Sequence, residues 1–313
     1  MVLRVPEGLV LKIPEGLVLK IPEGLVLKIP RGLVLKIPRG LVLKTITVFV
    51  CRVAILGLIP FAFYSLFHTF AEMEKRAIIV GASSGIGREV ALLLLAEGWH
   101  IGVAARREES LMELKAVAPG RVEVMNIDVT KVDAGERLLA LIEQLGGMDL
   151  YFHASGIGKQ NRMLTEDIEL STMDTNAVGF TRMIGTAYRY FANRGEGHIA
   201  AITSIAGTKG LGPAPAYSAT KAMQSTYLQA LEQQSRQRRL NIRFTDIRPG
   251  FVKTALLNDN FPYPMLMRPE AVARDIVRSI YRGRHVRIVD WRYRVLTFVW
   301  RLIPNWLWRR LKI

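Results

Sequence analysis

The chain has 313 residues, of which half are hydrophobic and 22% are charged, and this composition excludes a wholly disordered protein. A single cysteine excludes a disulfide-stapled secreted scaffold, and the scattered histidines form no zinc-type cluster, so we expect no metal. Most of the net charge of +16 lies at the two ends, with +5 in residues 1–72 and +8 in residues 282–313. Basic ends around a nearly neutral middle indicate surface contacts at the ends, and we expect no nucleic-acid partner.

Residues 1–44 are dominated by an octapeptide repeat, LVLKIPEG, in which the seventh position varies between Glu and Arg. A proline in every repeat forbids a continuous helix, whereas each Val-Leu-Lys-Ile run could form a short strand between turns. The copies are nearly identical and lack the capping repeats of a solenoid. We therefore favour a disordered or non-native extension over a binding array.

Residues 45–72 form a hydrophobic segment in which a run of 22 residues, long enough to span a bilayer, contains one charge, Arg52. The basic residues before it would keep the N-terminus in the cytoplasm and carry the rest of the chain across the membrane. The segment could be an interfacial anchor kinked at Pro60, a true span, or the result of a start site placed too early. We favour the last, because Met73 opens a stretch of 241 residues that suits one complete domain.

The first strand of that domain is predicted at residues 77–80, and it runs into the sequence GASSGIG of residues 81–87 and then into a helical pattern. In this setting Gly81 permits a tight turn, Gly85 lets the backbone approach a pyrophosphate, and Gly87 lets the helix pack on the strand. The phosphates would bind the free N–H groups at the start of the helix. The motif therefore predicts a dinucleotide-binding site.

A second predicted strand, residues 100–105, ends in Arg106 and Arg107. A site for NAD places a carboxylate here for the ribose hydroxyls, whereas guanidinium groups pair with the 2′-phosphate of NADP. The two arginines could instead begin a solvated helix. We favour NADP(H) over NAD(H) as the cofactor and, because that cofactor is cytosolic, we expect a cytoplasmic protein.

Further strands are predicted at residues 122–127 and 149–154, each after a helix-like segment. Strands that alternate with helices favour a parallel sheet, because each crossover helix packs on a face of the sheet. The predicted fold class is therefore α/β, a Rossmann-like doubly wound parallel sheet with three layers.

The second half of the domain contains Tyr217 and Lys221 in a helix-like stretch over residues 213–239, and their spacing of four places both on one helical face. Ser204 lies thirteen residues before Tyr217, where the predicted strand 198–202 ends. The carboxyl ends of parallel strands are where open α/β sheets bind ligands. The tyrosine–lysine pair alone is common by chance, so its setting is what makes it informative.

Over about residues 75–290 the sequence resembles the short-chain dehydrogenase/reductase family. The resemblance rests on motifs that occur in order and at the family's spacing: GxxxGIG at 81–87, Asp128, Asn176, Ser204, YxxxK at 217–221, and Pro249-Gly250 with Thr254. It implies that residues 73–290 form an NADP-binding catalytic domain that interconverts a carbonyl and an alcohol. A homodimer or homotetramer is the expected assembly.

The resemblance implies four catalytic residues. Tyr217 would give a proton to the carbonyl oxygen as hydride arrives, and Ser204 would hold that oxygen by a hydrogen bond. Lys221 would lower the pKa of Tyr217 and bond the nicotinamide ribose. Asn176 would anchor a water in a proton relay toward Lys221.

The resemblance also implies a set of cofactor-binding residues, among which the segment after residue 248 would fix the nicotinamide carboxamide. The residues of this set are Gly81, Ser83, Ser84, Gly85, Ile86, Gly87, Arg106, Arg107, Asp128, Val129, Ala154, Gly156, Tyr217, Lys221, Pro249, Gly250, Val252 and Thr254.

Simpler interpretations remain open at three of these positions. Ser204 could be an ordinary strand-end hydroxyl, Asn176 a helix kink or cap, and Asp128 a cap of the following helix. One departure from the family is clear, because HASG at residues 153–156 stands where the family usually has Asn-Asn-Ala-Gly. We interpret His153 as a structural substitute, with a catalytic base as the alternative.

Residues 255–267, which correspond to the family's mobile lid over the substrate and are called the lid segment here, are rich in apolar, aromatic and methionine side chains. They favour a hydrophobic carbonyl or alcohol as substrate, unless they only pack on their own domain.

Residues 291–313 form a tail that mixes four tryptophans with five arginines and a lysine. Such a tail suits a peripheral contact with a membrane surface, or it could cover the active site or pack on a partner subunit.

Two rival functions belong to other classes. A protein of this fold could bind NADP(H) as a sensor without turnover, but such a sensor has no need of the proton relay, and Asn176, Ser204, Tyr217 and Lys221 are all present. A membrane scaffold that acts through residues 1–72 and the tail is a further alternative. We therefore predict an NADP(H)-dependent oxidoreductase.

Overall fold

The computed structural model describes residues 75–257 and 262–311, together with four three-residue strands nearer the N-terminus. The chain divides into two compact units, Met1–Met73 and Glu74–Ile313. In the first unit, each strand is the Val-Leu-Lys of one octapeptide, where short strands are predicted. The strands pair antiparallel, β1 (Val10–Lys12) with β4 (Val34–Lys36) and β2 (Val18–Lys20) with β3 (Val26–Lys28). The predicted hydrophobic segment 45–72 lies outside the described residues.

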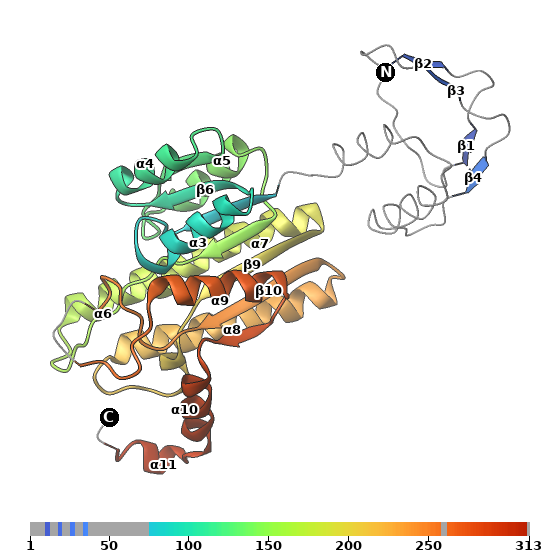
Figure 1. Cartoon of the computed structure of the whole chain (residues 1–313). Coiled ribbons are helices and arrows are strands. Elements are labelled where there is room, and N and C mark those ends of the chain that lie inside the picture. The colour runs from blue at the N-terminus through green and yellow to red at the C-terminus, as the bar shows by residue number, and fades with distance from the viewer. Residues whose placement is uncertain are drawn as a thin grey trace. The chain divides into compact units, whose positions relative to one another are not determined.

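The second unit is built on a seven-stranded sheet in the order β11-β10-β9-β8-β5-β6-β7, in which all neighbours are parallel (Figure 1). Each strand predicted from the sequence lies within two residues of the observed bounds at either end. The strands are β5 (Arg76–Val80), β6 (His100–Ala105), β7 (Val122–Asn126), β8 (Leu150–His153), β9 (Glu196–Ile202), β10 (Asn241–Arg248) and β11 (Val286–Ile288).

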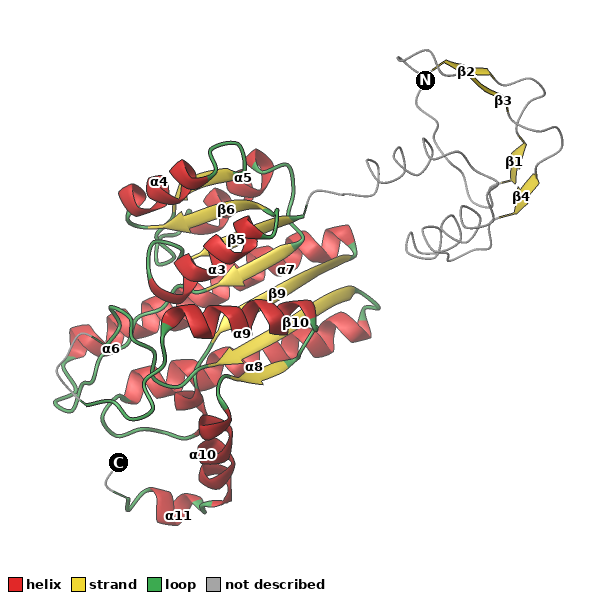
Figure 2. Ribbon diagram, viewed as in Figure 1, coloured by secondary structure: helices red, strands yellow, loops and turns green. Residues whose placement is uncertain are grey.

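Helices cover both faces of this sheet (Figure 2). One core lies between the sheet and helices α3, α4 and α9, and the other lies between the sheet and α5, α7 and α8. The doubly wound, three-layer α/β fold is therefore confirmed. The helices are α3 (Gly85–Ala96), α4 (Glu108–Val117), α5 (Ala134–Gln144), α6 (Glu166–Met173), α7 (Phe180–Arg194), α8 (Pro215–Gln237) and α9 (Pro269–Tyr281).

The strand order creates the place where a ligand can bind. The chain runs outward from β5 to β6 and β7, then returns to place β8 on the other side of β5. The loops that leave the carboxyl ends of β5 and β8 therefore diverge to opposite faces at this edge of the sheet, and it is at such a point that open α/β sheets bind ligands. The segments that follow β9 and β10 reach the same edge.

Two further helices, α10 (Trp291–Leu302) and α11 (Asn305–Trp308), form the predicted tail. The buried indole of Trp308 donates a hydrogen bond to the carbonyl of Gly210 over 2.8 Å, so the tail packs on the loop that follows β9. Within the residues that the structure describes, we find no helix with both the length and the apolar character needed to cross a bilayer.

Candidate active site

Tyr217 and Lys221 lie one turn apart on α8, as the spacing predicts. The ammonium nitrogen of Lys221 is 5.7 Å from the centre of the Tyr217 ring, and the Tyr217 hydroxyl is hydrogen-bonded to Ser204. Ser204 follows β9, and its Oγ accepts a hydrogen bond from the Ala206 N–H over 3.1 Å at the start of a short 3-10 helix. Lys221 and Ser204 are buried, whereas Tyr217 is half-buried and keeps part of its surface open. The structure thus brings the three predicted side chains together.

The pKa of Tyr217 differs from the expectation that Lys221 lowers it. Burial raises the pKa of Tyr217 above its ordinary value near 10, and the hydrogen bond with Ser204 lowers it only in part. Burial also lowers the pKa of Lys221 to about 8, although the carboxylate of Asp246 favours its charged form. Lys221 is therefore mostly charged at neutral pH, but the acidification of Tyr217 expected from it is opposed by burial.

Asn176 lies in a single turn of π-helix, Asp174–Gly179, between α6 and α7. Its side chain clamps the backbone of Ile157, because Oδ1 accepts from the Ile157 N–H at 2.9 Å and Nδ2 donates to the Ile157 carbonyl at 2.7 Å. Its own backbone carbonyl accepts a hydrogen bond from Gln224 at 2.7 Å. Wide turns of this kind are frequent at functional sites, so the geometry is compatible both with the simpler interpretation of a helix kink and with a functional residue.

The glycine loop connects β5 to α3 and leaves no room for a side chain at Gly81 or Gly87. A Cβ atom at Gly87 would lie 2.2 Å from the carbonyl oxygen of Gly81, and one at Gly81, whose φ is +92°, would lie 2.5 Å from the backbone nitrogen of Ser155. The backbone therefore forms a bare cradle at the start of a twelve-residue helix, where free N–H groups favour a phosphate. The residues present fit the pyrophosphate of a dinucleotide.

The two arginines after β6 take different positions. Nη2 of Arg107 donates to the hydroxyls of Ser84 at 2.8 Å and Ser83 at 3.2 Å, and its guanidinium therefore lies against the glycine loop. Arg106 lies instead near Asp128 and helps to lower the pKa of that carboxyl group. Because Arg107 also stands at the N-cap of α4, the interpretation that the arginines begin a solvated helix holds as well.

Asp128 does not cap the following helix, because α5 begins only at Ala134. Its Oδ1 accepts hydrogen bonds from the N–H and the hydroxyl of Thr130, at 3.0 and 2.8 Å. Burial opposes ionisation of Asp128, but these hydrogen bonds and the nearby Arg106 and Lys131 hold its pKa below the ordinary value.

Most of the remaining predicted cofactor residues follow strands that end at the same edge of the sheet. Ala154 and Gly156 follow β8, and Pro249 and Gly250 follow β10. A Cβ atom at Gly85 would lie 3.1 Å from the Thr254 methyl group, so the glycine loop and the segment after β10 face each other closely. The other residues of the set in this region are Ile86 on α3, Val129 after β7, and Val252, which forms an isolated bridge with Met267.

His153 is completely buried and lies too deep to contact a substrate directly. Its Nδ1 is 2.9 Å from the Tyr151 hydroxyl, and its ring packs edge-on against Phe180. Burial, together with the charge of Lys221, lowers the pKa of His153 to about 3, so the imidazole is neutral at physiological pH. These contacts favour the structural interpretation over a catalytic base.

Comparison with known proteins identifies the family. Residues 75–263 match the model of the family described as short chain dehydrogenase. The chain belongs to this family. It is similar to a Myxococcus xanthus protein described as an uncharacterized oxidoreductase, with 36% identity over 75% of this chain and 95% of the relative. A Mycobacterium tuberculosis protein with a similar description is 30% identical over 70% of this chain and 89% of its own.

Two solved structures resemble this short-chain dehydrogenase. A variant of actinorhodin polyketide ketoreductase with NADPH is 25% identical, covers 69% of this chain and 95% of its own, and has a TM-score of 0.61. ElxO with NADP bound, which is 22% identical, shares the fold with a TM-score of 0.63 over 71% of this chain and 100% of its own. This short-chain dehydrogenase is thus an oxidoreductase of an NAD(P)-dependent family.

Sequence reasoning missed two residues that shape the site. Gln224, one turn beyond Lys221, contacts both Lys221 and Asn176. Tyr293, on the tail helix α10, is completely buried against the segment after β10. Gln224 was missed because the sequence does not show which polar residue of a helix turns inward, and Tyr293 because the tail pattern gives no docking partner.

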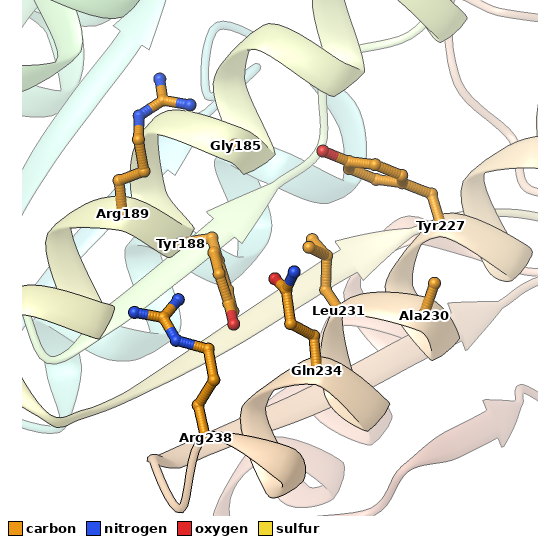
Figure 3. A pocket seen from close by; sticks show the side chains of 8 residues that line it. All are labelled: Gly185, Tyr188, Arg189, Tyr227, Ala230, Leu231, Gln234 and Arg238. Atoms are coloured by element: carbon orange, nitrogen blue, oxygen red, sulfur yellow. The ribbon is translucent and has the colours of Figure 1, made fainter.

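A pocket of about 550 Å³ lies away from these residues, between α7 and α8 (Figure 3). Its lining includes Tyr188, whose buried hydroxyl has no hydrogen-bond partner among the described residues. The described part of the chain holds no group of three or more His, Cys, Asp or Glu side chains that could bind a metal ion.

Proposed function

We propose that this short-chain dehydrogenase transfers a hydride between NADP(H) and the carbonyl or alcohol carbon of a hydrophobic small molecule, with Tyr217 handling the proton. The observation that carries the proposal is the hydrogen bond between the Tyr217 and Ser204 hydroxyls, with the Lys221 ammonium close to the same ring. The nicotinamide supplies the hydride when the cofactor is bound.

Each catalytic side chain has a distinct task in the proposed reduction. The Ser204 hydroxyl donates a hydrogen bond to the substrate oxygen, and this bond strengthens as negative charge develops there. Tyr217 transfers its proton to the same oxygen, and the Lys221 ammonium stabilises the phenolate left behind. In oxidation the phenolate takes the proton from the alcohol. Half-burial of Tyr217 supports this role, since the phenol must meet both the protein and the substrate.

The position of Arg107 supports NADP(H) as the cofactor. Its guanidinium, held by Ser83 and Ser84, would pair with a 2′-phosphate above the glycine loop. The similar actinorhodin polyketide ketoreductase structure contains NADPH. Because this cofactor is kept mostly reduced in the cytoplasm, we place the enzyme there and favour reduction as its direction.

Exposed apolar side chains on two loops that follow the carboxyl ends of strands support a hydrophobic substrate. Met163 and Leu164 lie on the loop after β8, and Leu256 and Leu266 lie on the lid segment. Part of that segment packs on its own domain, because Met267 is buried and the Tyr263 ring packs at a tilt against Phe251, with 4.7 Å between the ring centres. The lid segment therefore combines an anchored end with apolar groups that remain available to a ligand.

A second copy of this chain is the partner that we propose for the α7–α8 face. The pocket between these helices is lined by the half-buried ring of Tyr227 and by the exposed side chains of Arg189 and Arg238, and this lining supports a partner that fills the pocket with its own side chains. Sedimentation of the purified protein tests this assembly. A monomer at micromolar concentration contradicts it.

The tail has an outer face that suits a membrane surface. Trp291, Phe298 and Leu302 form an exposed stripe on one side of α10, and the tail carries five arginines that favour anionic headgroups, of which Arg292 is paired with Asp290. Its inner face packs on the domain through Tyr293 and Trp308. Flotation with anionic liposomes compares the full chain with the Phe298→Asp, Leu302→Asp double variant. If the full chain and the variant float with the liposomes to the same extent, membrane contact through this face is contradicted. The remaining interpretation is then that the tail covers its own domain.

A panel of carbonyl compounds assayed with NADPH and with NADH tests the main proposal. Wild type is expected to turn over apolar ketones or aldehydes with NADPH, and Tyr217→Phe to bind NADPH with little turnover. NADPH binding without turnover by wild type on any member of the panel would favour the cofactor sensor. Preference for NADH would contradict the role given to the arginine pair.

A further inference from the structure

A buried side-chain amide links the backbone of Asn176 to the ammonium of Lys221. Gln224 is completely buried on α8, three residues after Lys221 and therefore on the same helical face. Its Nε2 donates to the Asn176 carbonyl at 2.7 Å, and its Oε1 accepts from Lys221 Nζ at 3.0 Å. The amide thus makes the connection that the family resemblance assigns to a water.

The orientation of this amide is fixed by its two neighbours. If the amide were reversed, its NH₂ group would face the ammonium of Lys221 and its oxygen would face the Asn176 carbonyl. Both contacts would be repulsive, and burial of Gln224 strengthens that repulsion. Gln224 therefore presents an acceptor to Lys221 at all times, whereas a water molecule could turn or leave.

Lys221 is held from two sides as a result. Its ammonium has three N–H donors, and the described contacts use two of them, one on Gln224 and one on the Ile202 carbonyl at 3.1 Å. These two acceptors determine the direction of the third N–H. An acceptor fixed beside a buried ammonium also favours the charged form, which burial otherwise disfavours.

We propose that Gln224 is a positioning residue for the reaction: it keeps Lys221 charged and directs its remaining N–H, in the place of a relay water. This inference rests on the proposed function. An amide side chain does not pass on a proton as a water does, so the proton that re-forms the Tyr217 phenol must reach it by a route other than the Asn176 carbonyl.

Gln224→Met tests the role, because methionine is similar in length but offers neither the acceptor nor the donor. The alkaline limb of the pH profile of kcat for reduction, at saturating NADPH, is expected to move down by about one to two pH units as the pKa of Lys221 falls. Gln224→Glu, which places a carboxylate beside the ammonium, is expected to move the limb up. Gln229→Met is the matched control, since Gln229 is exposed on the same helix.

The outcomes separate this inference from the proposed function. Absence of turnover by wild type on the whole panel refutes the proposed function before Gln224 is considered. Suppose that wild type is active, that Gln224→Met shows a cooperative melting transition, and that the alkaline limb of its kcat profile is unchanged. The positioning role is then refuted, even if kcat is lower by the same factor at every pH. If Gln224→Met does not fold, an unshifted limb in Gln224→Glu refutes it.

Discussion

Gly250, just after β10, packs directly against the ring of Tyr293 on the tail helix α10: a Cβ atom at Gly250 would lie 2.2 Å from Cζ of that ring. The Tyr293 hydroxyl accepts a hydrogen bond from the Phe251 N–H at 3.1 Å and donates toward the carbonyls of Pro264 and Met265, at 2.9 and 3.1 Å. One tail residue therefore joins the predicted nicotinamide segment to the lid segment.

Gly250→Ala is expected to destabilise the protein by about 1–3 kcal/mol, because a methyl group cannot fit between the strand end and the ring. Urea denaturation measures the change in the free energy of unfolding. Gly120→Ala is the control, since no atom lies within 4 Å of a Cβ built at Gly120. An equal effect of the two substitutions would show that the Tyr293 contact is not tight.

Tyr293→Phe keeps the ring and removes the hydroxyl that holds the lid segment. We expect a loss of stability of about 1 kcal/mol and a rise of a few-fold in KM for the carbonyl substrate, with a smaller change in kcat. Steady-state kinetics with the best substrate of the panel measure both constants. An unchanged KM would mean that the lid segment keeps its position without this hydroxyl.

Arg107→Ala is expected to lower kcat/KM for NADPH by about 10- to 100-fold and to leave the value for NADH nearly unchanged, because only NADPH carries the 2′-phosphate. Arg106→Ala should have the smaller effect, since Arg106 lies toward Asp128 rather than Ser83 and Ser84. Titration of cofactor fluorescence measures affinity independently of turnover. A larger effect at Arg106 would reverse the assignment of the two arginines.

The buried histidines are expected to make the protein less stable in acid. Burial is the largest cause that lowers the pKa of both His153 and His198 to about 3, whereas an unfolded histidine titrates near 6.5. The unfolded chain therefore binds more protons below pH 6.5, and the free energy of unfolding falls as the pH drops from 6.5 toward 3. Denaturation curves of wild type and of His153→Asn are compared across this range. The pH dependence of the free energy of unfolding should show that the variant takes up about one proton fewer than wild type on unfolding. An unaltered pH dependence would place that proton elsewhere.

The sequence predicted the parts of this enzyme that depend on local pattern. The apolar run of β6 and the glycines after β5 have signatures within a few residues, and the spacing of Tyr217 and Lys221 follows from helical geometry. The π-helix at Asn176 has no such signature, because its carbonyl is held by Gln224 and its side chain by Ile157, both distant in sequence. Likewise, the basic aromatic pattern of the tail is compatible with lipid or protein, and only the fold shows Tyr293 turned inward.

The contact between Tyr293 and the lid segment has a consequence for biosynthesis. All seven strands of the parallel sheet precede residue 291, so the sheet can pair before the tail leaves the ribosome. Tyr293, whose hydroxyl donates toward the carbonyls of Pro264 and Met265, is translated only afterwards. A chain that ends at residue 290 would therefore have all seven strands but lack the Tyr293 contacts that hold residues 264 and 265, and competence for catalysis would require α10.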